Sequence, residues 1–139
     1  MIKAITYRDY NEMIALWKTD PHIRLSSADS PGNIRAFLKR NRGLSMKIAE
    51  GGKIAATMLC GWDGRRGYFH HLFVRSESRR KGYGKALVEE ACLRLARLGI
   101  AKAHIFVLPG NETGQAFWKA CGFYRRSESD VLFFSRDLE

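Results

Sequence analysis

The sequence predicts a single-domain mixed α/β protein in which helices cover both faces of one sheet. Short apolar runs alternate with amphipathic stretches, and the expected order of elements is β-α-α-β-β-β-α-β-α-β. A chain of 139 residues is long enough to bury one core of its own. A glycine-rich basic loop lies between a predicted strand and a predicted helix. We therefore expect one domain over residues 1–139.

The first third of the chain predicts one strand and two helices. Ile2–Tyr7 alternates between apolar and polar residues, which favours a strand. Asp9 and Glu12 have the spacing of a capping box, so a helix is expected over Tyr10–Lys18. A serine followed by a proline is typical of a helix start, and predicts a second helix over Ser30–Arg40.

The middle of the chain predicts a hairpin followed by a further strand. The apolar runs Ser45–Glu50 and Lys53–Gly61 are separated by two glycines, which is a two-residue hairpin signal. A turn rich in glycine then leads into a strand over Tyr68–Val74.

The last third predicts two helices and two strands. An apolar stripe at helical spacing runs through Lys85–Leu98, and a glycine ends it. The apolar run Ala103–Leu108 predicts a buried strand, after which Asn111 can cap another helix. Val131–Arg136 is expected to close the sheet as a last strand.

The loop between Tyr68–Val74 and the following helix predicts an anion site. Free N–H groups at a helix start and the helix dipole both favour a bound anion. Its two glycines allow a close backbone approach and can adopt positive φ, and its basic side chains suit a pyrophosphate. The loop comprises Arg79, Arg80, Lys81, Gly82, Tyr83, Gly84 and Lys85.

Two common phosphate-binding loops do not fit this segment. A Walker A loop has Ser or Thr after its lysine, but Ala86 follows Lys85. A dinucleotide fingerprint has a third glycine where this chain has Leu87, and the strand expected about twenty residues on carries no acidic residue.

The remaining pattern, R-x-x-G-x-G between strand and helix, resembles the acyl-CoA pyrophosphate loop of the GNAT superfamily of N-acetyltransferases. His70–Val74 is similar to the fourth strand of that family, and Ala103–Leu108 to its fifth. Asn111–Phe123 is similar to its N-x-x-x-x-A-x-x-x-x-x-G-F helix and turn. The resemblance covers the C-terminal half. It implies the acyl-CoA N-acyltransferase fold, a mixed, mostly antiparallel sheet with splayed fourth and fifth strands.

The resemblance also implies where acetyl-CoA binds. The loop would hold the pyrophosphate, and the backbone of Leu72, Phe73 and Val74 would pair with the pantetheine arm. Asn111 would lie beside that arm, with a second role as a helix cap. Trp118 stands where many family members have a tyrosine that protonates the CoA thiolate. An indole cannot supply that proton, so we expect Trp118 to contact the cofactor and Tyr124 or water to be the acid.

The fourth strand of the family often carries the general base, and here it offers His70 and His71. Neighbours on a regular strand point to opposite faces, so at most one would face the cleft and the two would not share a metal. His70 best matches the family position. A histidine with its ordinary pKa of about 6.5 suits a base at neutral pH. The alternative is that both are ordinary strand residues.

Composition limits the partners that we expect. The excess of Lys and Arg over Asp and Glu, 24 − 14 = 10, favours anionic ligands such as CoA. The basic residues are scattered, which argues against a nucleic-acid surface. No apolar run approaches the ~18–20 residues of a membrane span. Three widely spaced cysteines favour a reducing, cytoplasmic setting. No metal is expected, and the chain would be a monomer or a homodimer.

The function expected from these observations is transfer of an acetyl group from acetyl-CoA to a primary amine, directly in a ternary complex. Candidate acceptors are a protein N-terminus, a lysine, a polyamine, an aminoglycoside or an amino acid. Two alternatives remain open: a CoA-binding regulatory module that has lost turnover because of Trp118, and a small basic nucleic-acid-binding domain.

Overall fold

The centre of the molecule is a five-stranded sheet whose strands are ordered as they occur in the chain. A computed structural model describes residues 1–138. Neighbouring strands are antiparallel except for the last two, which run parallel. This confirms the mixed, mostly antiparallel sheet expected from the sequence. The strands are β1 (Ile2–Ala4), β2 (Met46–Glu50), β3 (Lys53–Trp62), β4 (Gly67–Val74) and β5 (Ala103–Ile105).

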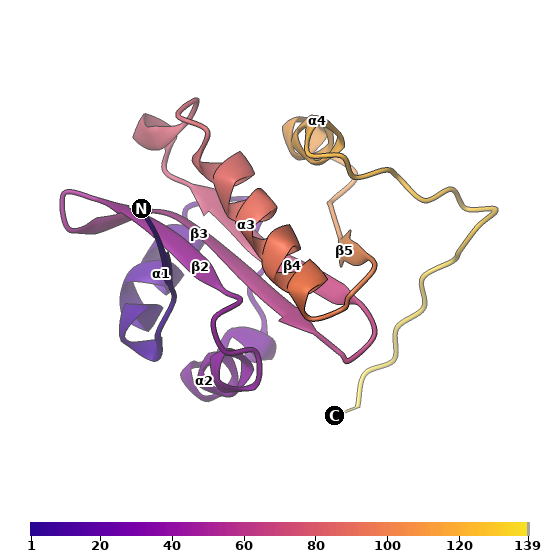
Figure 1. Cartoon of the computed structure of the whole chain (residues 1–139), viewed down its shortest axis with the longest axis horizontal. Helices are drawn as coiled ribbons and strands as arrows, with labels where there is room; N and C mark the ends of the chain where they lie inside the picture. The colour runs from indigo at the N-terminus through magenta and orange to yellow at the C-terminus, as the bar shows by residue number, and fades with distance from the viewer. Residues whose placement is uncertain (139) are drawn as a thin grey trace.

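Helices cover both faces of this sheet (Figure 1). One core lies between the sheet and α3, where Phe69 and Leu87 are fully buried, and Trp118 of α4 joins it. The other core lies between the sheet and the pair α1 and α2, and contains Trp17 and Ile34. The helices are α1 (Tyr10–Trp17), α2 (Pro31–Arg40), α3 (Tyr83–Arg97) and α4 (Glu112–Ala120), with short 3₁₀ turns at η1 (Tyr7–Asp9), η2 (Ser27–Asp29) and η3 (Ser76–Ser78).

Several local predictions are confirmed. Gly51 and Gly52 join β2 to β3 with φ of 56° and 79°, the positive values that a two-residue hairpin turn of this kind requires. Ser30 caps α2 by accepting a hydrogen bond from the Asn33 N–H. Gly99, with φ of 83°, follows the end of α3.

The predicted capping box of α1 is wrong. The carboxylate of Asp9 accepts a hydrogen bond from the Thr6 N–H, 2.9 Å away, which caps the preceding turn η1 instead. Glu12 reaches across to the sheet, where its Oε1 accepts from the Ile54 N–H at 2.7 Å. The helix still begins at Tyr10, because η1 leads directly into it.

The C-terminal part of the sheet is shorter than predicted. β5 ends at Ile105 rather than Leu108, and Val131–Arg136 is not a strand. Residues 131–134 are exposed, and the Phe133 ring contacts the Phe106 ring at a centroid distance of 4.8 Å. Alternation favours a strand, but a strand also needs a partner edge, and this segment does not pair with the sheet. No helix within residues 1–138 has the length and apolarity needed to cross a membrane.

Candidate active site

The loop between β4 and α3 has the geometry of an anion site. Gly82 is the N-cap of α3 and has φ of 81°, a left-handed conformation that only glycine adopts without strain. Arg80, two residues earlier, also has positive φ, 64°. The helix therefore begins at Tyr83, two residues before the predicted start, and its first N–H groups have no partner within the helix.

Gly84 is required for a different reason. Its conformation is helical, and an added Cβ would lie 3.2 Å from the Phe117 ring of α4. A side chain at this position would push α3 away from α4. Of the two glycines that were predicted to be free to take positive φ, only Gly82 does.

A carboxylate at the end of β2 holds this loop in place. Glu50 accepts hydrogen bonds from the Ser78 hydroxyl, from Lys81 Nζ at 2.7 Å and from the Tyr83 hydroxyl at 2.9 Å. These partners, Lys81 foremost, lower the pKa of Glu50 to about 2, and Glu50 in turn raises the pKa of Lys81 and of Tyr83. Sequence reasoning missed Glu50, because its partners lie about thirty positions further along the chain.

β4 contains a bulge at the two histidines. Leu59 of β3 lies opposite His70, whereas Thr57 lies opposite Phe73, so β4 has one residue more than β3 in this stretch. His71 takes up the extra residue with φ of 50°, which is uncommon for a residue other than glycine.

The bulge brings both histidines to the same face of the sheet. His70 contacts the Phe37 ring edge-on at 6.0 Å, and the His71 ring lies 4.8 Å from the Trp17 ring. Phe37 and Trp17 both belong to the core that α1 and α2 cover. The prediction that neighbouring histidines point to opposite faces is therefore wrong, since alternation holds only in a regular strand.

The surroundings of His70 lower its pKa. Burial, and then the neighbouring His71, hold the pKa of His70 below its ordinary value. The ring is therefore neutral at pH 7 and can accept a proton.

His71 is held by a buried carboxylate. Its Nε2 lies 2.7 Å from Oδ1 of Asp29, whose Oδ2 accepts a hydrogen bond from the Ser26 N–H at 3.0 Å. Both side chains are largely buried. The contact joins β4 to the segment between α1 and α2. The sequence shows the local Ser26–Asp29 spacing of a capping box, but gives no sign of the contact with His71.

A cleft opens where β4 and β5 separate. The two strands pair over three positions, ending with Phe69 opposite Ile105. Beyond this point a cleft of about 230 Å³ lies between the segment His70–Leu72 and the segment Phe106–Leu108. This geometry bears out the splayed strands. The loop after α1 contributes Asp20, His22, Ile23 and Arg24 to the lining, and α4 with its N-cap contributes Asn111 and Trp118.

Asn111 and Trp118 are both in the cleft wall. The Asn111 side chain also accepts a hydrogen bond from the Gly114 N–H at 2.9 Å, so it caps α4 as predicted. Trp118 is buried among aromatic rings and stacks on Phe69 at 5.9 Å. Tyr124 lies outside, 65% exposed, with Lys102 Nζ 5.9 Å from its ring centroid. Its role as an acid stays a prediction that this placement does not favour.

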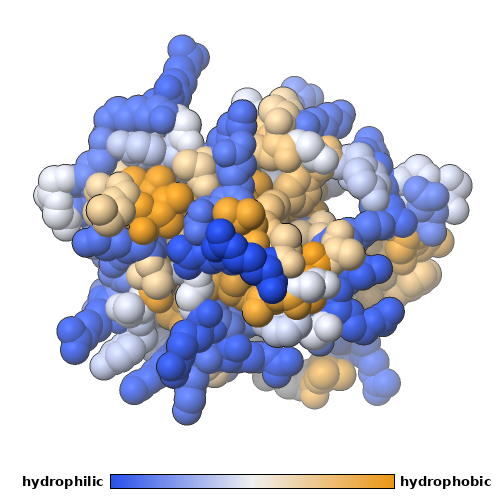
Figure 2. Space-filling model, in the orientation of Figure 1, coloured by the Kyte–Doolittle hydropathy of each residue, from blue (hydrophilic) through white to orange (hydrophobic). Residues whose placement is uncertain are grey.

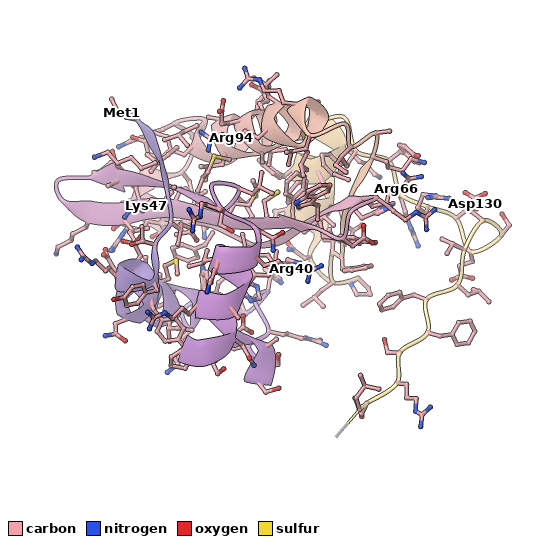
Figure 3. All side chains as sticks on the ribbon, turned by 60° about the horizontal axis from the view of Figure 1, so that its bottom comes forward. Met1, Arg40, Lys47, Arg66, Arg94 and Asp130 are labelled. Carbon is pink, nitrogen blue, oxygen red and sulfur yellow. The ribbon has the colours of Figure 1, made fainter. Side chains whose placement is uncertain are left out.

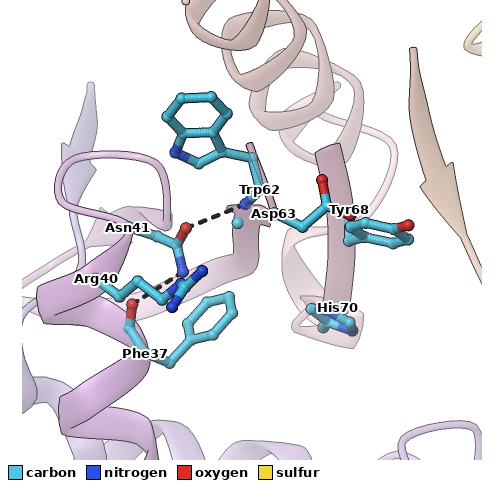
Figure 4. Close-up of a pocket in the computed structure, with 8 residues that line it drawn as sticks. Phe37, Arg40, Asn41, Trp62, Asp63, Tyr68 and His70 are labelled. Atoms are coloured by element: carbon cyan, nitrogen blue, oxygen red, sulfur yellow. Dashed lines mark hydrogen bonds between the residues drawn. The ribbon is translucent and has the colours of Figure 1, made fainter. Parts of the chain in front are cut away.

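A second recess of about 200 Å³, drawn in Figure 4, shares His70 with the cleft. Phe37, Trp62 and Tyr68 give it an aromatic lining, and Arg40 and Asp63 also line it. Asn41 supports this wall by accepting a hydrogen bond from the Trp62 N–H at 3.1 Å. His70 therefore borders a cleft on one side and an aromatic recess on the other. Among residues 1–138, no group of three or more His, Cys, Asp or Glu could hold a metal ion.

A five-stranded mixed sheet with a basic glycine loop next to a cleft between diverging strands defines an acyltransferase-like α/β protein. The chain belongs to the acetyltransferase (GNAT) family, whose family model matches residues 7–123. The family supports acetyl transfer as the chemistry of this protein.

Solved structures of acetyltransferases share the fold. Ard1 from Thermoplasma volcanium is 15% identical with a TM-score of 0.80, and the match covers 91% of this chain and 84% of that one. Glucosamine-6-phosphate N-acetyltransferase from Arabidopsis thaliana is 21% identical with a TM-score of 0.69, and the match covers 100% of this chain and 98% of that one. PaiA N-acetyltransferase from Thermoplasma acidophilum, in complex with coenzyme A, is 17% identical with a TM-score of 0.74, over 86% of each.

Proposed function

We propose that this protein transfers an acetyl group from acetyl-CoA to a primary amine, directly and within a ternary complex. The observation that carries the proposal is the cleft between β4 and β5, which has the anion loop at the end of β4 and a neutral histidine in its wall. Family membership supports the same chemistry.

The cofactor would extend from the loop into the cleft. The N–H groups at the start of α3, with Arg79, Arg80, Lys81 and Lys85, suit a pyrophosphate. Beyond Phe69, the outer edge of β4 has no strand beside it within residues 1–138, so Leu72–Val74 can pair with the amides of the pantetheine arm. Asn111 and Trp118 would contact the arm from the side of α4.

The reaction removes two protons from the acceptor nitrogen and supplies one to sulfur. His70 takes the first proton from the acceptor ammonium, and the neutral amine attacks the thioester carbonyl. The carbon–sulfur bond breaks, the acetyl group stays on the nitrogen, and the thiolate leaves. The thiolate takes its proton from Tyr124 or from water, and the second nitrogen proton replaces the one that this donor gave up. A backbone N–H beside the cleft would stabilise the oxyanion.

The acceptor is an amine of unspecified size. The names of two structural neighbours refer to very different acceptors: glucosamine-6-phosphate in one and the alanine of ribosomal protein S18 in an enzyme from Escherichia coli. The proposal accordingly covers a small-molecule amine as well as a protein N-terminus or lysine. A cytoplasmic location remains part of the proposal.

An acceptor screen with release of the CoA thiol as readout tests this function. We expect one class of amine to give thiol release that depends on the enzyme and on the amine, with a matching acetylated product by mass spectrometry. Acetyl-CoA binding without transfer to any amine would favour the CoA-binding regulatory module instead. Steep salt dependence of RNA or DNA binding without acetyl-CoA binding would favour the nucleic-acid-binding domain.

A further inference from the structure

The recess next to His70 has walls that are fixed by packing. Asn41, which is 4% exposed, donates a hydrogen bond to the Phe37 carbonyl at 3.2 Å and accepts one from the Trp62 N–H at 3.1 Å. It therefore ties the end of α2 to the end of β3. Gly61 lets Phe37 lie directly on β3, because an added Cβ would be 2.8 Å from the Phe37 ring. The recess is thus preformed, as ligand sites usually are.

The recess has an aromatic lining and the size of a single chemical group. Its volume of about 200 Å³ is below the roughly 300–1,000 Å³ of a pocket that holds a whole small ligand. Phe37, Trp62 and Tyr68 supply the rings of the lining, together with His70. Figure 2 shows that the surface over α2, at the bottom of the view, is hydrophilic. The lining therefore suits a flat apolar group that enters from polar surroundings.

Arg40 adds a positive charge to the wall of the recess. Figure 4 shows its guanidinium next to the Phe37 ring, and Figure 3 places Arg40 beside α2 and below the strands. Arg40 forms no ion pair among residues 1–138. Asp63, the acidic residue of the lining, is tied to the turn after β3, since its Oδ1 accepts hydrogen bonds from the N–H groups of Arg65 and Arg66 at 2.8 Å. The guanidinium is therefore available to a carboxylate of the ligand.

We propose that this recess is the acceptor subsite, and that the acceptor is a primary amine carrying a flat apolar ring and a carboxylate, an aromatic α-amino acid in the simplest case. The subsite presupposes the proposed acetyl transfer. His70 lies in the wall of both the cleft and the recess, so an amine at His70 can place its ring in the recess and its carboxylate beside Arg40. A polyamine or an aminoglycoside would instead bring further positive charge to Arg40, in a chain whose net charge is already +10.

A series of four amines tests the two features of the acceptor. L-phenylalanine has the ring and the carboxylate, phenethylamine has only the ring, L-alanine has only the carboxylate, and spermidine is a polycation. We expect kcat/KM for L-phenylalanine to exceed that for each of the others by roughly tenfold or more, because each lost contact leaves part of the subsite unfilled. Release of the CoA thiol measures all four.

The role of Arg40 is tested by a difference between two of these amines. Arg40→Gln should lower kcat/KM for L-phenylalanine by roughly fivefold or more relative to phenethylamine, which has no carboxylate to lose. Lys39→Gln is the matched control, because Lys39 is an exposed neighbour on α2 that does not line the recess, and it should leave the ratio as in wild type.

The possible failures are distinguishable. Transfer to amines without preference for the ring and the carboxylate, or an equal effect of Arg40→Gln on both amines, would overturn the subsite and leave acetyl transfer standing. If no amine is acetylated, calorimetric titration of N-acetyl-L-phenylalanine in the presence of CoA decides. Binding that is weakened by Arg40→Gln and not by Lys39→Gln would support the subsite although the proposed transfer fails, and absence of binding would overturn both.

Discussion

The two sides of β4 are built in different ways. The proposed cofactor loop uses one continuous stretch, from Arg79 to Lys85, whose shape follows from the left-handed Gly82 and the start of α3. The proposed acceptor side combines three separate segments: the loop after α1, helix α2 and the two histidines of the bulge. A local motif fixes the first geometry, whereas the second depends on how distant segments pack.

Mutations on the two sides of β4 should therefore have different consequences. Changes in the loop should alter acetyl-CoA affinity and leave the proton chemistry intact. Changes at the bulge should alter turnover or acceptor binding and leave acetyl-CoA affinity intact. The predictions below test that separation, beginning with the largest expected effect.

Replacing His70 should have the largest effect on turnover. We expect His70→Gln to lower kcat/KM for the amine by about 10²–10⁴-fold, the usual contribution of a general base, with unchanged acetyl-CoA affinity. His71→Asn is the control, because asparagine tolerates positive φ and loses the link to Asp29. Steady-state kinetics measures both. A larger loss in the His71 variant would assign the base to His71.

The proposed role of His70 as the base predicts that kcat/KM falls at low pH. Burial holds the pKa of His70 below its ordinary value of 6.5, so the neutral, active form persists below that pH. We expect kcat/KM to fall as pH drops, with a midpoint below 6.5, and His70→Gln to lack this limb. A midpoint above 6.5 would contradict the assignment.

Replacing Trp118 should change stability more than chemistry. Trp118→Tyr removes part of a ring that stacks on Phe69 and contacts Phe117 and Phe123. We expect a loss of roughly 1–2 kcal/mol in the free energy of unfolding, because the core would be left underpacked. A tyrosine in this slot could protonate the thiolate, so kcat should be kept or raised. A large drop in kcat with an intact fold would show that the indole itself is needed.

Replacing Glu50 should make stability less sensitive to acid. Hydrogen bonds from Lys81, Ser78 and Tyr83 hold its pKa at about 2 in the folded state, against 4.5 when unfolded. Its contribution is therefore complete above pH 4.5 and is lost as pH falls towards 2. We expect the Tm of Glu50→Gln to lie below wild type above pH 4.5 and to converge with it towards pH 2. Glu89→Gln, at an exposed position on α3, is the control, and its Tm should stay close to that of wild type over the same pH range.

Replacing Tyr124 is expected to have the smallest effect of the set. Its exposed position outside the cleft favours water as the proton source for the thiolate. Tyr124→Phe should then change kcat less than about twofold. A fall of about 10²–10⁴-fold with unchanged acetyl-CoA affinity would instead establish Tyr124 as the acid.

The sequence predicted what depends on local chemistry. The hairpin at Gly51 and Gly52, the cap at Asn111 and the order of the elements as far as α4 follow from turn and capping residues or from periodicity. Family motifs located the loop and the diverging strands. The bulge at His71 was missed because its signal is a register shift against β3, which becomes visible only when the strands pair.

Long-range polar contacts and the tail were missed for similar reasons. The partners of Glu50 and Asp29 lie on other elements, and no spacing in the sequence connects them. Val131–Arg136 has the pattern of a strand, but a pattern does not supply a partner edge.

Titration of acetyl-CoA into the Gly82→Val variant tests most directly the central claim, that the loop before α3 binds acetyl-CoA. A left-handed conformation costs a non-glycine residue about 1–2 kcal/mol, so the loop should leave its anion-binding geometry. Gly64→Val in the turn between β3 and β4 carries similar strain at φ of 94°, also with open space around its Cβ, and is the matched control. We predict that calorimetry will show affinity reduced roughly tenfold or more by Gly82→Val and unchanged by Gly64→Val. Equal affinity in the two variants and in wild type would contradict the loop as the acetyl-CoA site.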